Sequence, residues 1–285
     1  MEVSLDKIRK SWKSLEGYHT QVYFAPEAVA AYQQAGLDFI LGYFASRSAP
    51  MGKVSDKVVA SVFYVFKPEL VTMAIPKAWD IIDPDKLTEI RYDAADKALR
   101  RILSDSIDSK DILIAAEITK KIALAATNNF AGRPLFAGHC NIAWPNIPHM
   151  VLFHAQTLIR EFRGDGHMLA LVTHGIRPLE ALILDAAESN DVSVGFLKST
   201  RGWSEDEWNA TENDLTEREI ILKNDGKLSL TDKGQTLKTS IETLTDNLSS
   251  VAYSKITDEE LDTLINVGKQ FSEILSQANS FLKQG

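Results

Sequence analysis

Arg160–His167 is the segment that most limits how this chain can fold, because it carries four charged side chains between two apolar runs. Met150–Phe153 precedes the segment and Met168–Val172 follows it, and apolar runs of this kind usually pack inside a protein. An interior charge must be paired or hydrogen-bonded, because an unpaired one costs several kcal/mol or more. The segment therefore predicts either a buried network of ion pairs or a polar site.

The rest of the chain has mainly helical patterning. Apolar residues recur at three- and four-residue steps after Pro26, and Pro84–Leu103 has the same periodicity with alternating charge on the other face. Proline suits the first turn of a helix, so these positions are expected helix starts. Pro148–Arg163 is expected to form a helix that ends at Gly164, with a second short helix over His167–His174.

The C-terminal third has a specific order of elements. Ser204–Glu207 has the serine and the acid of a capping box and begins one helix. Asn224–Gly226 is a hairpin turn signal, and Leu228–Leu230 alternates as a strand does. Thr231–Gly234 then begins a long helix that continues to about Leu248. Helix, turn, helix, hairpin and long helix is the winged-helix order.

This part of the chain resembles the MarR-like winged-helix superfamily, over roughly residues 178–248. The resemblance lies in Leu215–Ile221, and in Asp225–Gly234 with the helix that follows. In that superfamily these phrases mark the end of the recognition helix, the wing and the start of the dimerisation helix. The resemblance implies a ligand-responsive transcriptional regulator that binds DNA as a homodimer.

The whole chain is also similar to a family of bacterial helix-turn-helix-type proteins of unassigned function. The phrases that carry this similarity are Tyr23–Ala28, Gly132–Phe136 and Arg160–His167. Membership implies a fold but no activity.

The expected fold is mainly α, with two helical lobes, the second of which contains a winged-helix element with a small β-hairpin. We expect an N-terminal helical lobe over residues 1–131, a linker over 132–147, a winged-helix lobe over 148–252 and a C-terminal helix over 253–285. The N-terminal lobe is interpreted as a degenerate winged-helix-like repeat.

A weak internal repeat supports the two-lobe interpretation. Val59–Trp79 can be aligned with Leu179–Trp203 when a gap of several residues is allowed. The alignment places Arg47 opposite Arg163. Because clefts between lobes are common ligand sites, both arginines are expected to face one cleft.

Composition narrows the function classes. The net charge of −8 argues against a protein that coats nucleic acid or anionic lipid. The helix expected after Ser204 carries seven acids as far as Glu219 and only Arg218 as a base, whereas a DNA reader needs bases facing the phosphates. We therefore expect no specific DNA binding. Cys140 is the only cysteine, and no signal peptide or membrane-length apolar run is visible, so a cytoplasmic location is expected.

The candidate site is a polar pocket between the lobes. An anionic ligand would be held by bidentate arginine contacts, and a histidine oriented by a carboxylate would act as acid or base. The predicted catalytic residues are His167, Asp165 and Glu161. The predicted ligand-binding residues are Arg47, His149, His154, Gln156, Arg160 and Arg163. The alternative is that the same charges form a structural ion-pair network.

Other chemistries have weaker support in the sequence. His149 and His154 lack the spacing of a helical zinc pair, and no metal ligand is assigned. The cofactor is left unknown; no haem attachment motif is present, although a histidine-rich helical pocket could accept haem. Cys140 is expected to be a buried, unreactive thiol rather than a nucleophile.

The function predicted from the sequence is small-molecule binding on a repurposed winged-helix scaffold, with catalysis if the acid–base groups reach the ligand. The alternative is a MarR-like regulator that binds DNA as a dimer. A third class is a purely structural or interaction protein.

Overall fold

The computed structural model describes residues 3–189, 193–224 and 227–278, and within them the protein is mainly α-helical with one antiparallel β-hairpin, as predicted. The helices are α1 (Leu5–Phe24), α2 (Pro26–Gln34), α3 (Phe39–Ser48), α4 (Asp56–Val62), α5 (Pro68–Ala74), α6 (Lys77–Ile81), α7 (Pro84–Leu103), α8 (Lys110–Ala126), α9 (Pro134–His139), α10 (Pro148–Thr173), α11 (Pro178–Glu188), α12 (Val194–Arg201), α13 (Glu205–Glu217), α14 (Asp232–Ser250) and α15 (Asp258–Ala278). The hairpin is formed by β1 (Ile221–Asn224) and β2 (Lys227–Leu230).

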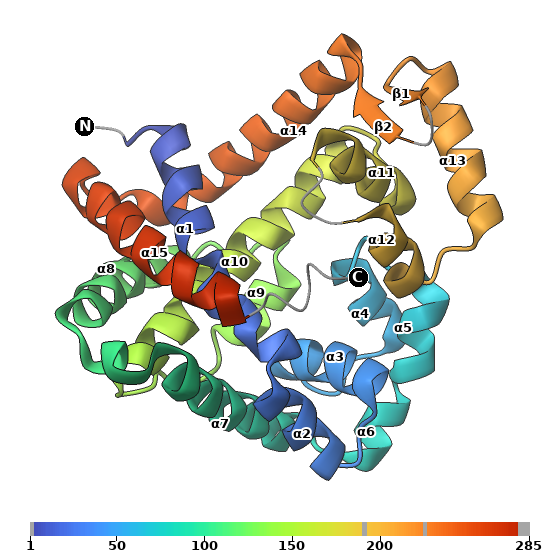
Figure 1. Ribbon diagram of the computed structural model, residues 1–285. Helices are drawn as coiled ribbons and strands as arrows, with labels where there is room; N and C mark the ends of the chain where they lie inside the picture. Colours follow the sequence, from blue (N-terminus) through green and yellow to red (C-terminus); the bar gives the residue numbers. More distant parts are fainter. Residues whose placement is uncertain (1–2, 190–192, 225–226, 279–285) are drawn as a thin grey trace.

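The helices form three hydrophobic cores. The first joins α1, α7, α8, α10 and α15, the second lies among α2 to α7, and the third lies between the end of α10 and α11 to α14. Figure 1 shows α10 running through the middle, with α1 beside it, α15 packed against α1, and α11 to α14 on the opposite side from α7. The two ends of the described chain therefore pack together, and α10 belongs to two of the cores.

Helix starts follow the local signals in the sequence. Proline occupies the first turn of α2, α7, α10 and α11. A backbone N–H in the first turn has no partner within the helix, so the N–H that proline lacks costs no hydrogen bond there. Ser204 and Glu207 form the predicted capping box at the start of α13. None of the helices in the described part of the chain combines the length and the apolar character that a bilayer crossing needs.

The predicted break at Gly164 is wrong, because α10 is one helix of 26 residues that passes through both glycines. A side chain at Gly166 would have its Cβ 2.6 Å from Nη1 of Arg133, whose guanidinium donates hydrogen bonds to the carbonyls of Phe162 and Leu248. Gly166 thus allows a buried arginine to lie against the helix. At Gly164 a Cβ would meet only a carboxylate oxygen of Glu161, at 3.8 Å.

The segment expected to be an irregular linker contains the short helix α9. Its Phe136 N–H donates to the Asp165 carboxylate of α10 at 2.9 Å. The segment around Pro134 is thus held to α10 by two contacts, from Arg133 to the carbonyl of Phe162 and from the Phe136 N–H to Asp165. Two sequence phrases noted separately, 132–136 and 160–167, form a single packed unit.

The C-terminal elements follow the predicted order, α12, α13, hairpin and α14. Ile221 pairs with Leu230, and Asn224 pairs with Lys227. The predicted turn residues 225–226 lie outside the described part of the chain, as do Val192 and the last residues of the predicted C-terminal helix. Gly234 lets the first turn of α14 approach the backbone carbonyl of Ile220 so closely that a Cβ there would overlap its oxygen.

Candidate functional site

A central cavity of about 770 Å³ lies between α1, α3, α10, α11, α14 and the residues that follow α4 and end α12. Of the sequence-predicted site residues, five line it: Arg47, Arg160, Glu161, Arg163 and His167. Arg47 comes from α3, and the other four come from one face of α10. The structure thus places Arg47 and Arg163 in the lining of one cavity.

Two of these arginines are already paired. Arg163, 7% exposed, donates from Nη2 to Glu242 and to Asp246 of α14, both at 2.9 Å. Arg163 is therefore buried and ion-paired. Arg160 donates to Glu16 of α1 and to Glu161, again at 2.9 Å. On these two positions the structure favours the ion-pair network over an open anion site.

Arg47 has no such partner. It is 9% exposed, and among the described residues its guanidinium has no carboxylate within ion-pairing distance. Its one hydrogen bond goes from Nη1 to the Tyr43 hydroxyl at 2.8 Å, and its buried Nε has no acceptor. The guanidinium carbon lies 4.4 Å from the centre of the Phe63 ring. A stacked guanidinium of this kind keeps its in-plane N–H groups free for an anion.

Arg201 is a second unpaired arginine in the cavity lining, and sequence reasoning missed it. Among the residues that the structure describes, its Nη1 donates to Thr200 alone, at 2.7 Å, and its buried Nε has no acceptor. Its guanidinium lies over Phe66 at 4.6 Å. Burial and the charge of Arg47 lower the pKa of Arg201. Arg201 is the last residue of α12, and nothing in the neighbouring sequence indicated that it would reach the cavity.

His167 lies at a different place in the lining, against α14. Its Nδ1 is 3.0 Å from the Thr245 hydroxyl and 3.6 Å from Oε1 of Glu242. Burial lowers the pKa of His167, although Glu242 and Asp185 oppose the shift. Burial thus favours the neutral ring, and Nε2 has no hydrogen bond within the described residues.

Asp165 does not line the cavity, contrary to its predicted place beside His167. On the helix it points away from His167, toward α9, where it accepts the Phe136 N–H. Burial raises the pKa of Asp165 to about 7, although hydrogen bonds from backbone N–H groups and the charge of Arg133 favour the ionised form. Its role in the fold is to hold α9 against α10.

This pKa predicts a pH-dependent stability. The carboxyl has an ordinary value of 3.8 and a folded value of about 7, so the folded state holds the extra proton between these limits. The stabilisation that Asp165 contributes is complete below about pH 4 and is lost as the pH rises through 7. In the wild-type protein we expect the free energy of unfolding to fall by about 1 kcal/mol per pH unit across this window, and we expect Asp165→Asn to abolish this fall. Urea unfolding at several pH values measures it, and Asp93→Asn, an exposed change on α7, should keep the slope.

His149, His154 and Gln156 lie in the first half of α10 and do not line the cavity. His149 pairs with Asp96 of α7, and Nδ1 of His154 is 2.6 Å from the Tyr92 hydroxyl. Gln156 donates to the backbone carbonyl of Trp12 at 3.3 Å. Their expected place with the arginines is wrong, because the first half of α10 is surrounded by α1, α7 and α8 and only its second half borders the cavity.

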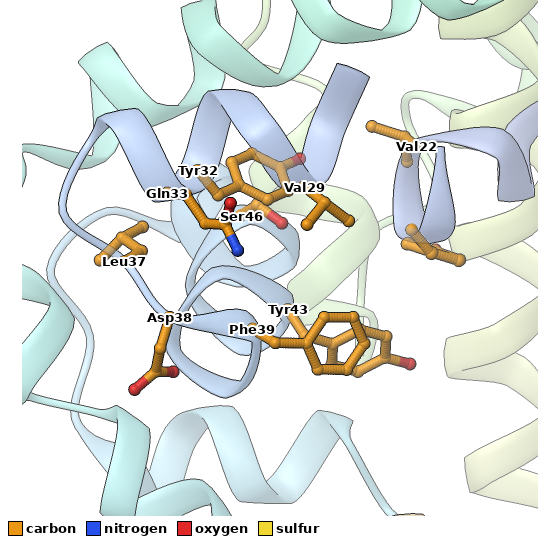
Figure 2. A pocket seen from close by; sticks show the side chains of 10 residues that line it. Val22, Val29, Tyr32, Gln33, Leu37, Asp38, Phe39, Tyr43 and Ser46 are labelled. Atoms are coloured by element: carbon orange, nitrogen blue, oxygen red, sulfur yellow. The ribbon is translucent and has the colours of Figure 1, made fainter. Parts of the chain in front are cut away.

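Figure 2 shows a second, smaller pocket. Its lining comes from α1, α2 and α3, and Tyr43 belongs to both linings. Its carboxylate, Asp38, is used as the cap of α3 and accepts the Leu41 N–H at 2.9 Å. The pocket therefore offers little free polar chemistry.

The described residues contain no group of histidine, cysteine, aspartate and glutamate side chains arranged to hold a metal ion. Burial raises the pKa of Cys140 to about 11, so its thiol is protonated at pH 7 and is a weak nucleophile.

In the comparison with known protein families, the chain matches a model described as a helix-turn-helix family over residues 8–282. The comparison with curated proteins and the comparison with solved structures each gave no match.

Proposed function

Because the chain belongs to this helix-turn-helix family, which assigns it a fold and no ligand, we propose its function from the cavity: it binds an anionic small molecule. The anionic group is held by Arg47 and Arg201. The winged-helix elements α11 to α14 then serve as one wall of a binding site rather than as a DNA reader. We also propose that this scaffold is of the MarR-like winged-helix type.

The observation that carries the proposal is the contrast between two pairs of arginines in one cavity. Arg160 and Arg163 each have two carboxylate partners, whereas Arg47 and Arg201 have none among the described residues. Arg47 is buried and Arg201 is half-buried, and the charge of Arg47 lowers the pKa of Arg201. Like charges held near each other out of water are costly unless an anion compensates them. Sites that bind a ligand often hold such uncompensated groups at the expense of stability.

The remaining lining indicates what the anion is attached to. Aromatic and aliphatic side chains form much of the wall, among them Trp12, Phe63 and Phe66. A cavity of about 770 Å³ falls in the range of sites that enclose a metabolite-sized molecule. These features support an organic anion with an apolar body. If the protein is also a catalyst, we propose His167 as the acid or base, because it lines the cavity and its Nε2 has no hydrogen bond within the described residues.

The proposal predicts an anion-dependent rise in melting temperature. A panel of inorganic phosphate, sulfate, citrate and alkanoates is screened by thermal shift at pH 7. A binding anion should add about 2.7 kcal/mol of stability at a hundredfold excess over its dissociation constant. Arg47→Gln and Arg201→Gln should each abolish the rise.

The matched control is Arg101→Gln, which removes an exposed arginine that pairs with Glu27 on the outer surface. It should leave the anion response unchanged. A response that survives both cavity variants, or one that Arg101→Gln also removes, would show that the anion binds elsewhere.

Two features support the absence of specific DNA binding. In helix-turn-helix readers the N-terminal residues of the recognition helix contact base edges. Here the corresponding end of α13 is docked on the N-terminal lobe: Glu207 accepts from Lys67 at 2.7 Å, and the Trp203 indole donates to the carbonyl of Val65 at 3.0 Å. The same end carries Glu205 and Asp206, which would face the phosphates.

We therefore predict no specific duplex binding at physiological salt in a gel-shift assay with genomic fragments. Affinity of about 10 nM or tighter, the range usual for regulators, would contradict the proposal and favour the regulator. Lys67→Ala removes the contact to Glu207 and leaves the acids of α13 in place, so it tests whether that contact is what prevents binding. We expect no binding from this variant either.

A further inference from the structure

The cavity has a second polar end, at His167, which the anion site does not use. Thr245 fixes the state of this histidine. The Thr245 hydroxyl donates its proton to the carbonyl of Ile241 at 2.8 Å, so it can only accept from Nδ1 of His167. Nδ1 therefore carries the hydrogen, and Nε2 is a hydrogen-bond acceptor. Glu242, 3.6 Å from Nδ1, supports the same arrangement.

The two ends are separated along α10. Arg47 and Arg160 both lie over the Tyr23 ring, with guanidinium carbons 4.9 and 5.6 Å from its centre, so Arg160 marks the anion end. His167 is seven residues further along the same helix, a rise of about 10 Å. The ionisable groups that act most strongly on the pKa of Arg47 are all different residues from those that act on the pKa of His167, so the two side chains lie in separate surroundings.

Gly164 occupies the helix face between these ends. Its lack of a side chain leaves the middle of the cavity open, since a Cβ there would meet only one atom, at 3.8 Å. Met168 and Leu171 line the cavity beyond it from the same helix. Between the two ends, the lining residues of α10 are Glu161, Arg163 and Gly164, and the two charged side chains already have partners, Arg160 for Glu161 and the carboxylates of α14 for Arg163. The middle of the cavity is therefore unobstructed at Gly164, and its charges are already paired.

We propose that the ligand is an elongated organic anion that lies along α10, with its anionic end at Arg47 and Arg201 and a hydrogen-bond donor such as a hydroxyl at Nε2 of His167. This inference rests on the proposed function and adds a ligand class to it. It also gives the ion pairs of Arg163 a role at the site: by holding Glu242, Arg163 positions the carboxylate beside His167.

The test uses two matched series of probes, the ω-hydroxyalkanoates from hydroxybutanoate to hydroxydodecanoate and the corresponding plain alkanoates. Dissociation constants of the full-length protein are measured by calorimetry at pH 7. We expect affinity in the hydroxy series to peak at one chain length, where the hydroxyl strengthens binding about threefold to tenfold over the plain acid. In the plain series no such optimum should occur.

Two variants assign the gain to His167 and to the path past Gly164. His167→Phe should remove the advantage of the hydroxyl while plain alkanoates still bind, and His167→Gln, which keeps an acceptor, should restore part of it. Gly164→Leu should block the long members of both series and spare the short ones. Gly195→Leu is the control, because Gly195 lies in α12 with open space around it and outside the cavity lining.

The outcomes separate this inference from the proposed function. If Arg47→Gln abolishes alkanoate binding but the hydroxyl gives no advantage at any length, the elongated-ligand inference is overturned and the anion site stands. If neither series binds while phosphate still does so through Arg47, the inference is again overturned. Failure of every anion in the thermal-shift panel overturns both.

Discussion

Replacing Arg163 by alanine should lower the free energy of unfolding by about 3–5 kcal/mol, the usual cost of breaking a buried ion pair from one side. Arg163 is almost fully buried and donates to Glu242 and Asp246, and its guanidinium lies over the Trp12 ring at 4.6 Å. The substitution leaves two carboxylates with less compensation between α10, α14 and α1. Urea unfolding at pH 7 measures the change.

Arg101→Ala provides the comparison, because its pair with Glu27 lies at the surface and should contribute only about 0.2–1 kcal/mol. An unchanged melting temperature for Arg163→Ala would mean that the ion pairs with α14 do not form in solution. The interpretation of this half of the cavity as a structural network would then fail.

Gly234→Ala should destabilise the protein by about 3 kcal/mol, the upper part of the range for an overpacked site. A Cβ at Gly234 would overlap the backbone oxygen of Ile220, which cannot move freely because it accepts the Thr231 N–H at 3.1 Å. The start of α14 would have to move away from the hairpin. Chemical denaturation measures the loss.

Gly195→Ala is the matched change, since it also replaces a helical glycine but has nothing within 4 Å of the new Cβ. It should leave stability unchanged or raise it by up to about 1 kcal/mol, the difference in helix propensity. Equal effects of the two substitutions would show that the close approach at Ile220 is relaxed in solution.

Much of the fold could be predicted from local signals. Prolines in first turns and the capping box at Ser204 depend on residues within one helical turn, and the structure has helices at these places. The end predicted at Gly164 failed for a non-local reason. The glycines of α10 serve contacts and space supplied by other parts of the chain, Arg133 at Gly166 and the open cavity at Gly164. A glycine that ends a helix and one that admits a neighbour look the same in a sequence.

The candidate site was predicted in its general location but not in its chemistry. The charged segment of α10 was expected to form either a buried network of ion pairs or a polar site, and in the structure Arg163 is buried and ion-paired. Which arginines stay unpaired depends on partners 79 and 83 residues away for Arg163 and 144 residues away for Arg160, and no short-range pattern encodes them. Arg201 was missed because it meets the other cavity residues only through the folding of distant parts of the chain.

The central claim is that Arg47 and Arg201 hold an anion, and a crystal structure of the protein soaked in selenate tests it most directly. Selenate scatters anomalously, so its position can be read without reference to the protein. We expect an anomalous peak between the two guanidinium groups, and none there in Arg47→Gln crystals soaked in the same way. Selenate bound only at surface positions or beside the already paired Arg163, with the space between Arg47 and Arg201 empty, would contradict the account.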